Sequence, residues 1–319
     1  MAIHYILRAV IILLGILHKT EGAGHTWSYE GTNGPSFWKT NYPICNQQTQ
    51  SPIDLPPIAS MTYDSNLDPF TLHAFDKPGS MYNLTMLNNG HTVKVNVENG
   101  ASVMVSGGGL AHSTYKVAQF HFHWGSNDTR GSEHTYNGLS YPMELHIVTY
   151  DSRYVSLGEA VDKNSGLAVL GFFFEINDDA NCNYSPLVDA MTNVEYYGGN
   201  NFKMSGFKLR HLMPMMFGNY FRYDGSLTTP PCYESVQWTV FWQKIPISTA
   251  QMEKFRKLYT DSSKAHSISN NYRPVQALND RTVTTNMKLP ETTSSSSELF
   301  SNISALVFVS VFTIFKRWF

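Results

Sequence analysis

Residues Gln119–Ser126 read Gln-Phe-His-Phe-His-Trp-Gly-Ser, and the alternation in this stretch decides the fold around it. Side chains on a β-strand point to opposite faces with a period of two. A strand here would bury three aromatic rings on one face and present His121 and His123 side by side on the other. Imidazole is the commonest metal ligand in proteins, so the pair indicates a metal site. The alternative is an amphipathic strand whose histidines make ordinary hydrogen bonds, and this stretch alone leaves both interpretations open.

A third ligand candidate lies in Glu144–Tyr150, a second β-prone run in which Glu144, His146 and Val148 share one face. If the two runs pair, His146 joins His121 and His123. Three neutral nitrogens, with no nearby candidate thiolate or ligating carboxylate, would leave a tetrahedral ion with one open position, which is typical of catalytic zinc.

Several segments occur together and in one order along the chain, and this set resembles the signature segments of the α-class carbonic anhydrases. The resemblance covers about residues 27–281 and implies a Zn²⁺ enzyme that interconverts CO2 and bicarbonate. The segments are WSYEGTNGPSFW, QSPID, NNGH, QFHFHWGS, GSEHTYNG, MELHIV, GSLTTPPC and NYRPVQ.

The periodicity of the chain predicts one β-dominated α+β domain, with no internal repeat and no mid-chain linker. Leu167–Ile176 is continuously apolar, as expected for a strand buried on both faces. The resemblance adds a large, mostly antiparallel, twisted central sheet of about ten strands around a buried zinc, with a few short surface helices. Further strands are predicted at Thr92–Val97, Val103–Val105 and Val236–Phe241.

Two helix signals stand out in the second half of the chain. Ser185-Pro186 predicts a helix start with a cap and a first-turn proline, and Gly198 predicts its end. Ser248 and Gln251 have the spacing of a capping box at the start of a second helix.

Both ends of the chain have the composition of processing signals. The apolar run Tyr5–Leu17 predicts a signal peptide over residues 1–23, followed by the catalytic domain over residues 24–285. We expect residues 286–298 to form a Ser/Thr-rich linker with a GPI attachment site, and residues 299–319 to form a hydrophobic propeptide. We therefore expect a lipid-anchored protein on the extracellular face of the plasma membrane. A transmembrane span over Leu299–Phe315 is the competing interpretation, although this run is only marginally long enough.

Secretion agrees with the cysteine content, since disulfides persist outside the cytosol. Cys45 and Cys232 match positions that are bridged in the GPI-linked, type IV-like branch of the family, and Cys182 is left as a free thiol. Three sequons make candidate glycosylation sites at Asn83, Asn127 and Asn183.

The resemblance assigns partners to each imidazole and to the nucleophile. Gln119, Glu144 and the backbone carbonyl of Asn271 would orient the ligands His121, His146 and His123 in turn. Zinc lowers the pKa of its bound water to about 7, the value known for carbonic anhydrase, which gives a hydroxide at neutral pH. Thr228, by donating to ionised Glu133, would accept from that hydroxide and aim it at CO2. Without the resemblance, Glu133 would be a structural carboxylate and Thr228 a turn residue.

The remaining site residues come from the resemblance as well. His91 matches the proton shuttle, although a lone histidine after glycine is otherwise an incidental turn residue, and Tyr29 matches a residue that orders cavity water. The expected substrate-binding residues are Val148, Val169, Leu227, Thr228, Thr229 and Trp238; on pattern alone the apolar ones would read as core.

Two positions depart from the family pattern. Lys94 stands where a neutral polar residue is common, and Leu157 stands where several relatives carry Phe. His134 resembles a structural histidine.

The alternatives to a CO2-hydrating enzyme belong to two classes. One is a catalytically inactive, carbonic-anhydrase-like adhesion or receptor ectodomain, but such relatives lack zinc ligands that persist here. The other is a zinc esterase, which we expect only as a side activity. The formal net charge of −2 gives no reason to expect a nucleic-acid partner. Bicarbonate or proton transporters remain candidate partners.

Overall fold

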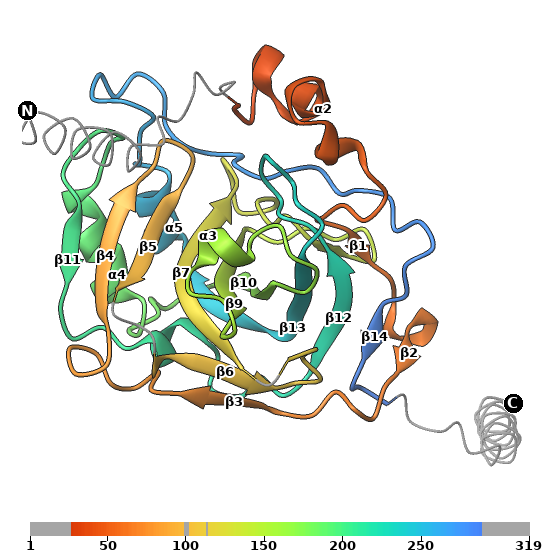
Figure 1. Cartoon of the computed structure of the whole chain (residues 1–319). Helices are drawn as coiled ribbons and strands as arrows, with labels where there is room; N and C mark the ends of the chain where they lie inside the picture. Colours follow the sequence, from red (N-terminus) through yellow and green to blue (C-terminus); the bar gives the residue numbers. More distant parts are fainter. Residues whose placement is uncertain (1–26, 99–101, 113, 289–319) are drawn as a thin grey trace, which may run out of the picture. The chain divides into compact units, whose positions relative to one another are not determined.

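The computed structural model describes residues 27–98, 102–112 and 114–288, and its main feature is a 12-stranded sheet (Figure 1). Its main path runs in the order β11-β4-β5-β7-β9-β10-β13-β12-β14-β2, and β3 and β6 pair beside it. Along this path the strands are β11 (Phe202–Met204), β4 (Asn83–Asn88), β5 (Val93–Glu98), β7 (Tyr115–Trp124), β9 (Met143–Asp151), β10 (Leu167–Asn177), β13 (Val236–Ser248), β12 (Tyr220–Gly225), β14 (Thr284–Thr285) and β2 (Thr62–Tyr63); the lateral pair is β3 (Phe70–His73) and β6 (Met104–Gly107).

The sheet is mixed, although most neighbours are antiparallel as predicted. β10 pairs with β9 in the antiparallel sense and with β13 in the parallel sense. Its first eight residues are buried, because both of its edges are paired and both of its faces are covered. β14 and β2 make a second parallel pair, and β1 (Asp54–Leu55) and β8 (Thr135–Tyr136) form a separate two-stranded sheet.

The helices in the described residues are short. The predicted capping box at Ser248 and Gln251 is confirmed at the start of α5. The prediction for Ser185 is wrong in detail: Ser185 is the first helical residue, Tyr184 is the N-cap, and no side chain caps this end. The helices are η1 (Gly31–Asn33), η2 (Pro35–Phe37), α2 (Trp38–Asn41), η3 (Pro43–Asn46), η4 (Ile58–Ser60), α3 (Leu157–Ala160), α4 (Ser185–Ala190), η6 (Met191–Asn193), η7 (Leu209–Leu212) and α5 (Thr249–Phe255).

The predicted end of α4 at Gly198 is also wrong. The helix ends at Ala190 and tightens into η6, after which Val194 leaves the helical region. Gly198 does have the positive φ of a helix-terminating glycine, at +85°, but it serves a later turn. A positive φ marks a reversal of the chain, and sequence alone did not show which turn it closes.

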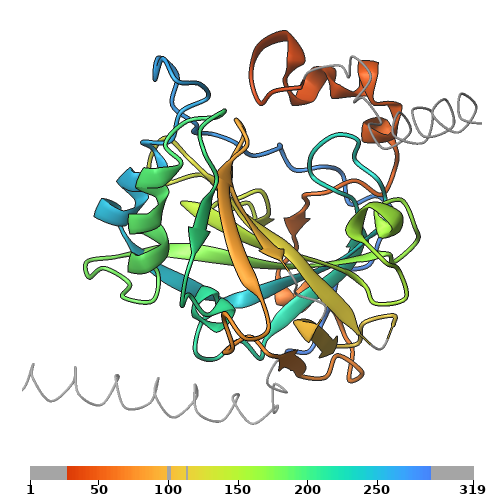
Figure 2. The same cartoon turned by 60° about the vertical axis from the view of Figure 1, so that its left-hand side comes forward.

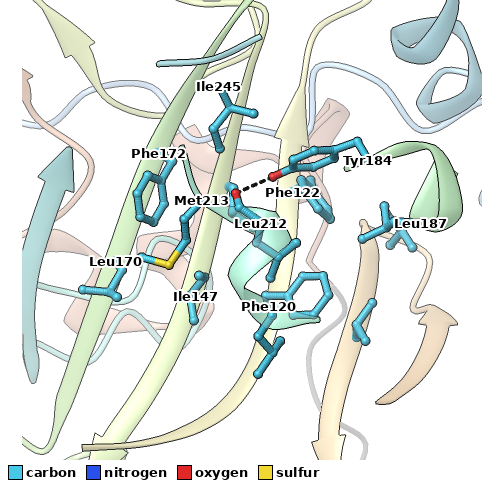
Figure 3. Packing of buried hydrophobic residues seen from close by; sticks show 14 of the residues in the cluster. Phe120, Phe122, Ile147, Leu170, Phe172, Tyr184, Leu187, Leu212, Met213 and Ile245 are labelled. Atoms are coloured by element: carbon cyan, nitrogen blue, oxygen red, sulfur yellow. Dashed lines mark hydrogen bonds between the residues drawn. The ribbon is translucent and has the colours of Figure 1, made fainter. Parts of the chain in front are cut away.

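The aromatic side chains of β7 belong to the main hydrophobic core, as the alternation predicts, and Figure 3 shows Phe120 and Phe122 within it. Phe120, Phe122 and Trp124 are fully buried. Phe255 of α5 packs on two of them, with its ring centroid 5.2 Å from Phe122 and 5.5 Å from Trp124. In both views α4 and α5 lie together on one side of the molecule (Figure 1, Figure 2). This packing fixes the outward-facing histidines on the opposite face of β7.

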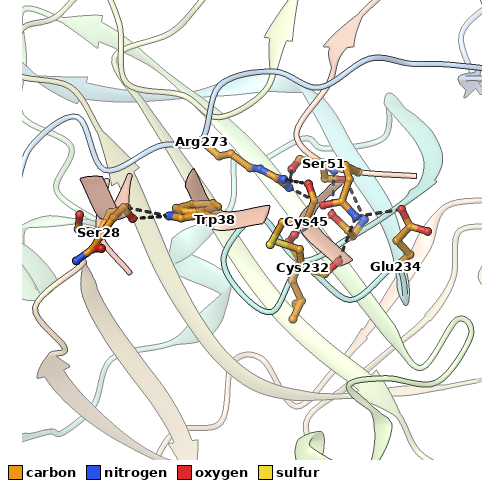
Figure 4. The surroundings of a disulfide bond; sticks show 11 residues. Ser28, Trp38, Cys45, Ser51, Cys232, Glu234 and Arg273 are labelled. Carbon is orange, nitrogen blue, oxygen red and sulfur yellow. Dashed lines mark hydrogen bonds between the residues drawn. A yellow bond between two sulfur atoms is a disulfide. The ribbon is translucent and has the colours of Figure 1, made fainter. Parts of the chain in front are cut away.

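A disulfide joins the N-terminal segment to the loop after β12, as predicted for Cys45 and Cys232 (Figure 4). Arg273 lies beside it and donates to the carbonyl oxygen of Cys45 at 2.9 Å and to that of Ser51 at 2.8 Å. Cys182 is exposed and unpaired, also as predicted.

The compact unit that contains the sheet ends at Asn286. The predicted signal peptide, residues 1–23, and the propeptide, residues 299–319, lie outside the described residues, as does the linker beyond residue 288. Within the described residues, no helix has the length and hydropathy needed to cross a membrane.

Candidate metal centre

Three imidazoles meet on the face of the sheet opposite the aromatic core. His121 of β7 and His146 of β9 are direct cross-strand partners, and His123 lies one step further along β7. One ring nitrogen from each histidine lies within 4.8 Å of the others. The two strands do pair, so His146 lies beside His121 and His123, where the sequence placed the third candidate ligand.

The second nitrogen of each imidazole has its own oxygen partner. His121 Nδ1 lies 2.9 Å from Gln119 Oε1, and His146 Nε2 lies 2.8 Å from Glu144 Oε1. His123 Nδ1 lies 2.7 Å from the carbonyl oxygen of Asn271. When these atoms donate, the other ring nitrogens keep a free lone pair: Nε2 of His121, Nε2 of His123 and Nδ1 of His146. His123 Nε2 is buried and has no hydrogen-bond partner in the described residues. Gln119, Glu144 and the carbonyl group of Asn271 thus each contact one imidazole of the cluster.

The electrostatics of the cluster keep these rings neutral at pH 7. Burial lowers the pKa of His123 to about 3, and it lowers the pKa of His146 below its usual value. The pKa of His121 falls well below the usual range, because burial and then the neighbouring imidazoles and Lys94 disfavour its charged form. Neutral, pre-aligned imidazoles are the form that binds a metal ion, so the donor set fits zinc.

Glu144 organises the buried layer behind the ligands. Its Oε2 accepts from the backbone N–H of Glu133 at 2.9 Å and of His134 at 2.8 Å. The His134 ring lies between Glu144 Oε1 at 2.7 Å and the Tyr223 hydroxyl at 2.6 Å. Although burial alone would raise the pKa of Glu144, His134 and His146 hold it below its usual range. The hydrogen bonds of Glu144 and His134 are therefore satisfied within the protein, since both ring nitrogens of His134 have a partner.

Glu133 reaches the metal-ligand cluster from a loop. Its Oε1 accepts from the backbone N–H of Arg273 at 2.8 Å, and its Oε2 lies 3.4 Å from His123 Nε2. Burial raises the pKa of Glu133 well above its usual value, although the Arg273 N–H and the Thr228 hydroxyl act in the opposite direction. Thr228 thus interacts with this carboxylate, although Oε2 itself makes no hydrogen bond of regular geometry.

An apolar row runs across three strands beside the imidazoles. Val148, Val169 and Trp238 are successive cross-strand partners on β9, β10 and β13, and all three are buried. The Trp238 ring centroid lies 4.7 Å from that of His146. The structure thus places the residues of the predicted apolar wall next to His146, one of the three imidazoles. Leu227 and Thr229 are half-buried in the loop that carries Thr228.

His91 lies at the edge of this arrangement, on the turn before β5. Its ring stacks on Trp27, with centroids 3.9 Å apart and planes inclined by 12°, and it meets Tyr29 edge-on. Burial lowers the pKa of His91, and it raises the pKa of Tyr29 well above its usual value. A cavity of about 380 Å³ is lined by both residues and by Asn271 and His266. His91 is therefore a half-buried imidazole that lines a cavity.

The comparisons with known proteins agree with this geometry. The family model for eukaryotic-type carbonic anhydrase matches residues 33–287. The chain is also 37% identical to carbonic anhydrase 1 of Monodelphis domestica over 269 residues, which is 83% of this chain and 100% of that protein.

The chain belongs to the eukaryotic-type carbonic anhydrase family. It is therefore an enzyme of CO2 hydration, and members of this family depend on zinc. The three-imidazole donor set described above suits zinc independently of the family assignment.

Two residues of this carbonic anhydrase's site were missed from sequence. Arg273 is buried and binds Glu133 through its backbone and the disulfide region through its guanidinium. Arg273 lies in the segment NYRPVQ, one of the segments that resemble the family, and this could have marked it as a candidate site residue.

Gly171 is the second. A Cβ there would stand 3.2 Å from Glu144 Oε1 and 3.6 Å from the Trp238 ring. Nothing in the apolar run around Gly171 marks it, because its role depends on two other strands.

Proposed function

We propose that this chain is a zinc enzyme that catalyses the reversible hydration of CO2 to bicarbonate and a proton. The observation that carries the proposal is the convergence of three imidazole nitrogens, each on a ring whose other nitrogen already has an oxygen partner. His121, His123 and His146 would hold the ion. A bound zinc supplies a Lewis acid that lowers the pKa of a coordinated water.

The residues around the metal site would each have a separate role in the reaction. A zinc ion held by the three imidazoles would place positive charge near Glu133 and so would favour its ionised form against the effect of burial, which raises its pKa. Thr228, having donated to that carboxylate, has only lone pairs left to offer and so fixes the orientation of a hydroxyl donor next to it. Val148, Val169 and Trp238 give an apolar surface that suits CO2. His91 accepts the proton released in each turnover and passes it to buffer.

A stopped-flow assay of CO2 hydration tests this function directly. We expect fast hydration by the purified protein, loss of activity with a zinc chelator, and recovery on adding Zn²⁺. Absence of hydration by zinc-loaded protein would favour an inactive binding ectodomain, and hydration that survives complete zinc removal would refute the zinc mechanism.

We further propose that the enzyme belongs to the GPI-anchored, type IV-like branch and acts at the extracellular face of the plasma membrane. The disulfide between Cys45 and Cys232 supports this, because such bonds persist in oxidising compartments. The sequence of residues 286–319 supports a lipid anchor. Phosphatidylinositol-specific phospholipase C should release the protein from cells; retention with the tail intact would favour a transmembrane span.

Glycosylation is the third part of the proposal. Asn83, Asn127 and Asn183 are all exposed, as acceptor sites must be. Peptide mapping after endoglycosidase treatment should find sugar remnants at one or more of them. A secreted chain without sugar at any of the three would contradict this part alone.

A further inference from the structure

Two methionines project into solvent from the loop between η7 and β12. Met215 is 90% exposed and Met216 is 78% exposed, whereas most large apolar side chains of the described residues are buried. Isolated exposed apolar residues are common, but two adjacent ones at the tip of one loop form a small apolar projection. We call Met215 and Met216 the methionine tip.

The loop that carries the methionine tip is held firmly by Arg210. The guanidinium donates to the carbonyl oxygens of Met213, Pro214 and Met215, at 3.2, 3.0 and 2.8 Å. It also lies 5.1 Å from the ring centroid of Phe217, and Phe217 packs on Phe241 of β13. The backbone therefore presents the two methionines outward in a fixed place, which favours a contact with something outside the domain.

The same loop lies where the chain leaves the folded unit. Asn286, the last residue of that unit, donates from its side chain to the carbonyl oxygen of Gly218 at 2.7 Å. Its Oδ1 accepts from the backbone N–H of Tyr220 at 3.1 Å. Residues 287–319 continue from this point and contain the apolar run Ile303–Phe315. The methionine tip is thus close in the chain to Gly218, which binds the last residue before the segment proposed to carry the membrane anchor.

We propose that the methionine tip inserts into the lipid surface to which the C-terminal segment tethers the domain, so that tip and tether together orient the enzyme. This inference rests on the proposed membrane anchor. Met215 and Met216 are flexible and apolar, so they can enter the acyl boundary without desolvating a polar group.

The charged side chains near the loop are of both signs. Lys208, Arg210 and His211 lie before the loop, and Asp68 is held close by through Tyr220, whose hydroxyl donates to the Asp68 carbonyl oxygen. Basic and acidic groups are thus both present, so anionic lipid is not required. Tethering raises the local lipid concentration, so even weak affinity of two side chains is sufficient for contact.

The experiment places an environment-sensitive fluorophore at the tip of the full-length protein. Met216→Cys is labelled in a Cys182→Ser background, which removes the exposed native thiol. Phe37→Cys, 51% exposed in η2, is the matched control. The loop of the methionine tip is bound to Asn286, which directly follows β14. Figure 1 and Figure 2 both show α2, which directly follows Phe37, on the side of the molecule opposite to β3 and the end of β14. Both proteins are reconstituted in phosphatidylcholine vesicles with or without doxyl-labelled lipid.

We expect the probe at 216 to shift to shorter emission wavelength and to be quenched at least threefold more than the probe at 37. Equal, water-like signals from both probes on vesicle-bound protein would overturn the proposal. If the native anchor is missing, the full chain is tethered to nickel-chelating lipid through a tag after Phe319, and the same comparison decides. The two proposals are then tested separately. Failure to bind vesicles without the tag would contradict the membrane anchor, whereas the fluorescence of the tagged, tethered protein tests the methionine tip.

Discussion

The side chain of Asn271 holds the backbone of His91, with Nδ2 2.8 Å from the His91 carbonyl oxygen. The backbone carbonyl of the same asparagine accepts from His123 Nδ1, and its Oδ1 accepts from the backbone N–H of Trp124. One residue therefore links the turn of the expected proton shuttle to a metal ligand and to the core strand.

Replacing Asn271 by alanine separates these roles. The Asn271→Ala variant keeps the carbonyl partner of His123, so zinc content should be unchanged. It leaves Trp124 N–H and the His91 carbonyl without a partner, so we expect a loss of about 1–3 kcal/mol in the free energy of unfolding. A looser His91 should lower kcat more than kcat/KM. Loss of zinc in this variant would contradict the assignment of the carbonyl as the partner of His123.

The His91→Ala variant tests proton transfer. An acid of pKa about 7 releases its proton to bulk water at only about 10³ s⁻¹ if recombination is limited to about 10¹⁰ M⁻¹s⁻¹. The turnover known for carbonic anhydrase is about 10⁶ s⁻¹, so a fast member needs an internal acceptor.

We expect kcat for CO2 hydration to fall at least tenfold in His91→Ala, with kcat/KM nearly unchanged and with recovery in imidazole buffer. An unchanged kcat at low buffer concentration would show that the proton leaves by another route, or that chemistry is slower than this limit.

Removing a ligand tests the metal centre itself. The His121→Ala variant should lose most of its zinc, because a three-histidine site is left with two protein ligands. Gln119→Ala, which removes only the partner of His121, should weaken zinc binding by about tenfold or more. His112→Ala alters a histidine paired with Asp151 outside the cluster and is the control. Full zinc retention and full activity in His121→Ala would refute the ligand assignment.

The pH dependence of the metal-free protein follows from the ligand histidines. Burial lowers the pKa of His123 from 6.5 to about 3, and it lowers those of His121 and His146 as well. Below pH 6.5 the unfolded chain therefore binds protons that the folded chain does not, so the free energy of unfolding falls as the pH falls.

Each such histidine contributes up to about 1.4 kcal/mol per pH unit. Urea unfolding of the metal-free protein should show a steep loss between pH 6.5 and 5, and a shallower loss in His123→Gln. An unchanged slope in that variant would contradict a neutral, buried His123.

The disulfide should stabilise both the fold and the Thr228 loop. Replacing Cys45 and Cys232 together by alanine should lower the free energy of unfolding by about 2–4 kcal/mol, since the bond closes a long loop. We also expect a lower kcat/KM, because Cys232 follows the segment that carries Thr228. Cys182→Ser, at an exposed free thiol, should change stability by less than about 0.5 kcal/mol and serves as the control.

The local sequence determined the strands of the site. The period of two in Gln119–Ser126 set which side chains of β7 are buried and which face the metal, because this alternation is a property of the extended backbone. Gln119 and His121, like Glu144 and His146, are two residues apart on one face, so their pairing follows from the same geometry. The direction of all three histidines could therefore be predicted from the sequence, whereas their meeting depended on the assumption that the two strands pair.

Only the tertiary structure decided the contacts between distant segments. The bonds from Arg273 to Glu133 and from Asn271 to His91 join residues 140 and 180 positions apart, and no local pattern encodes such a contact. The space that requires Gly171 exists only because Glu144 of β9 and Trp238 of β13 approach it from both sides. The predicted end of α4 at Gly198 was wrong for the same reason, because a glycine indicates a turn but does not show which helix or strand that turn follows. Local periodicity fixes the direction of each side chain, but the packing of the whole chain decides what that side chain meets.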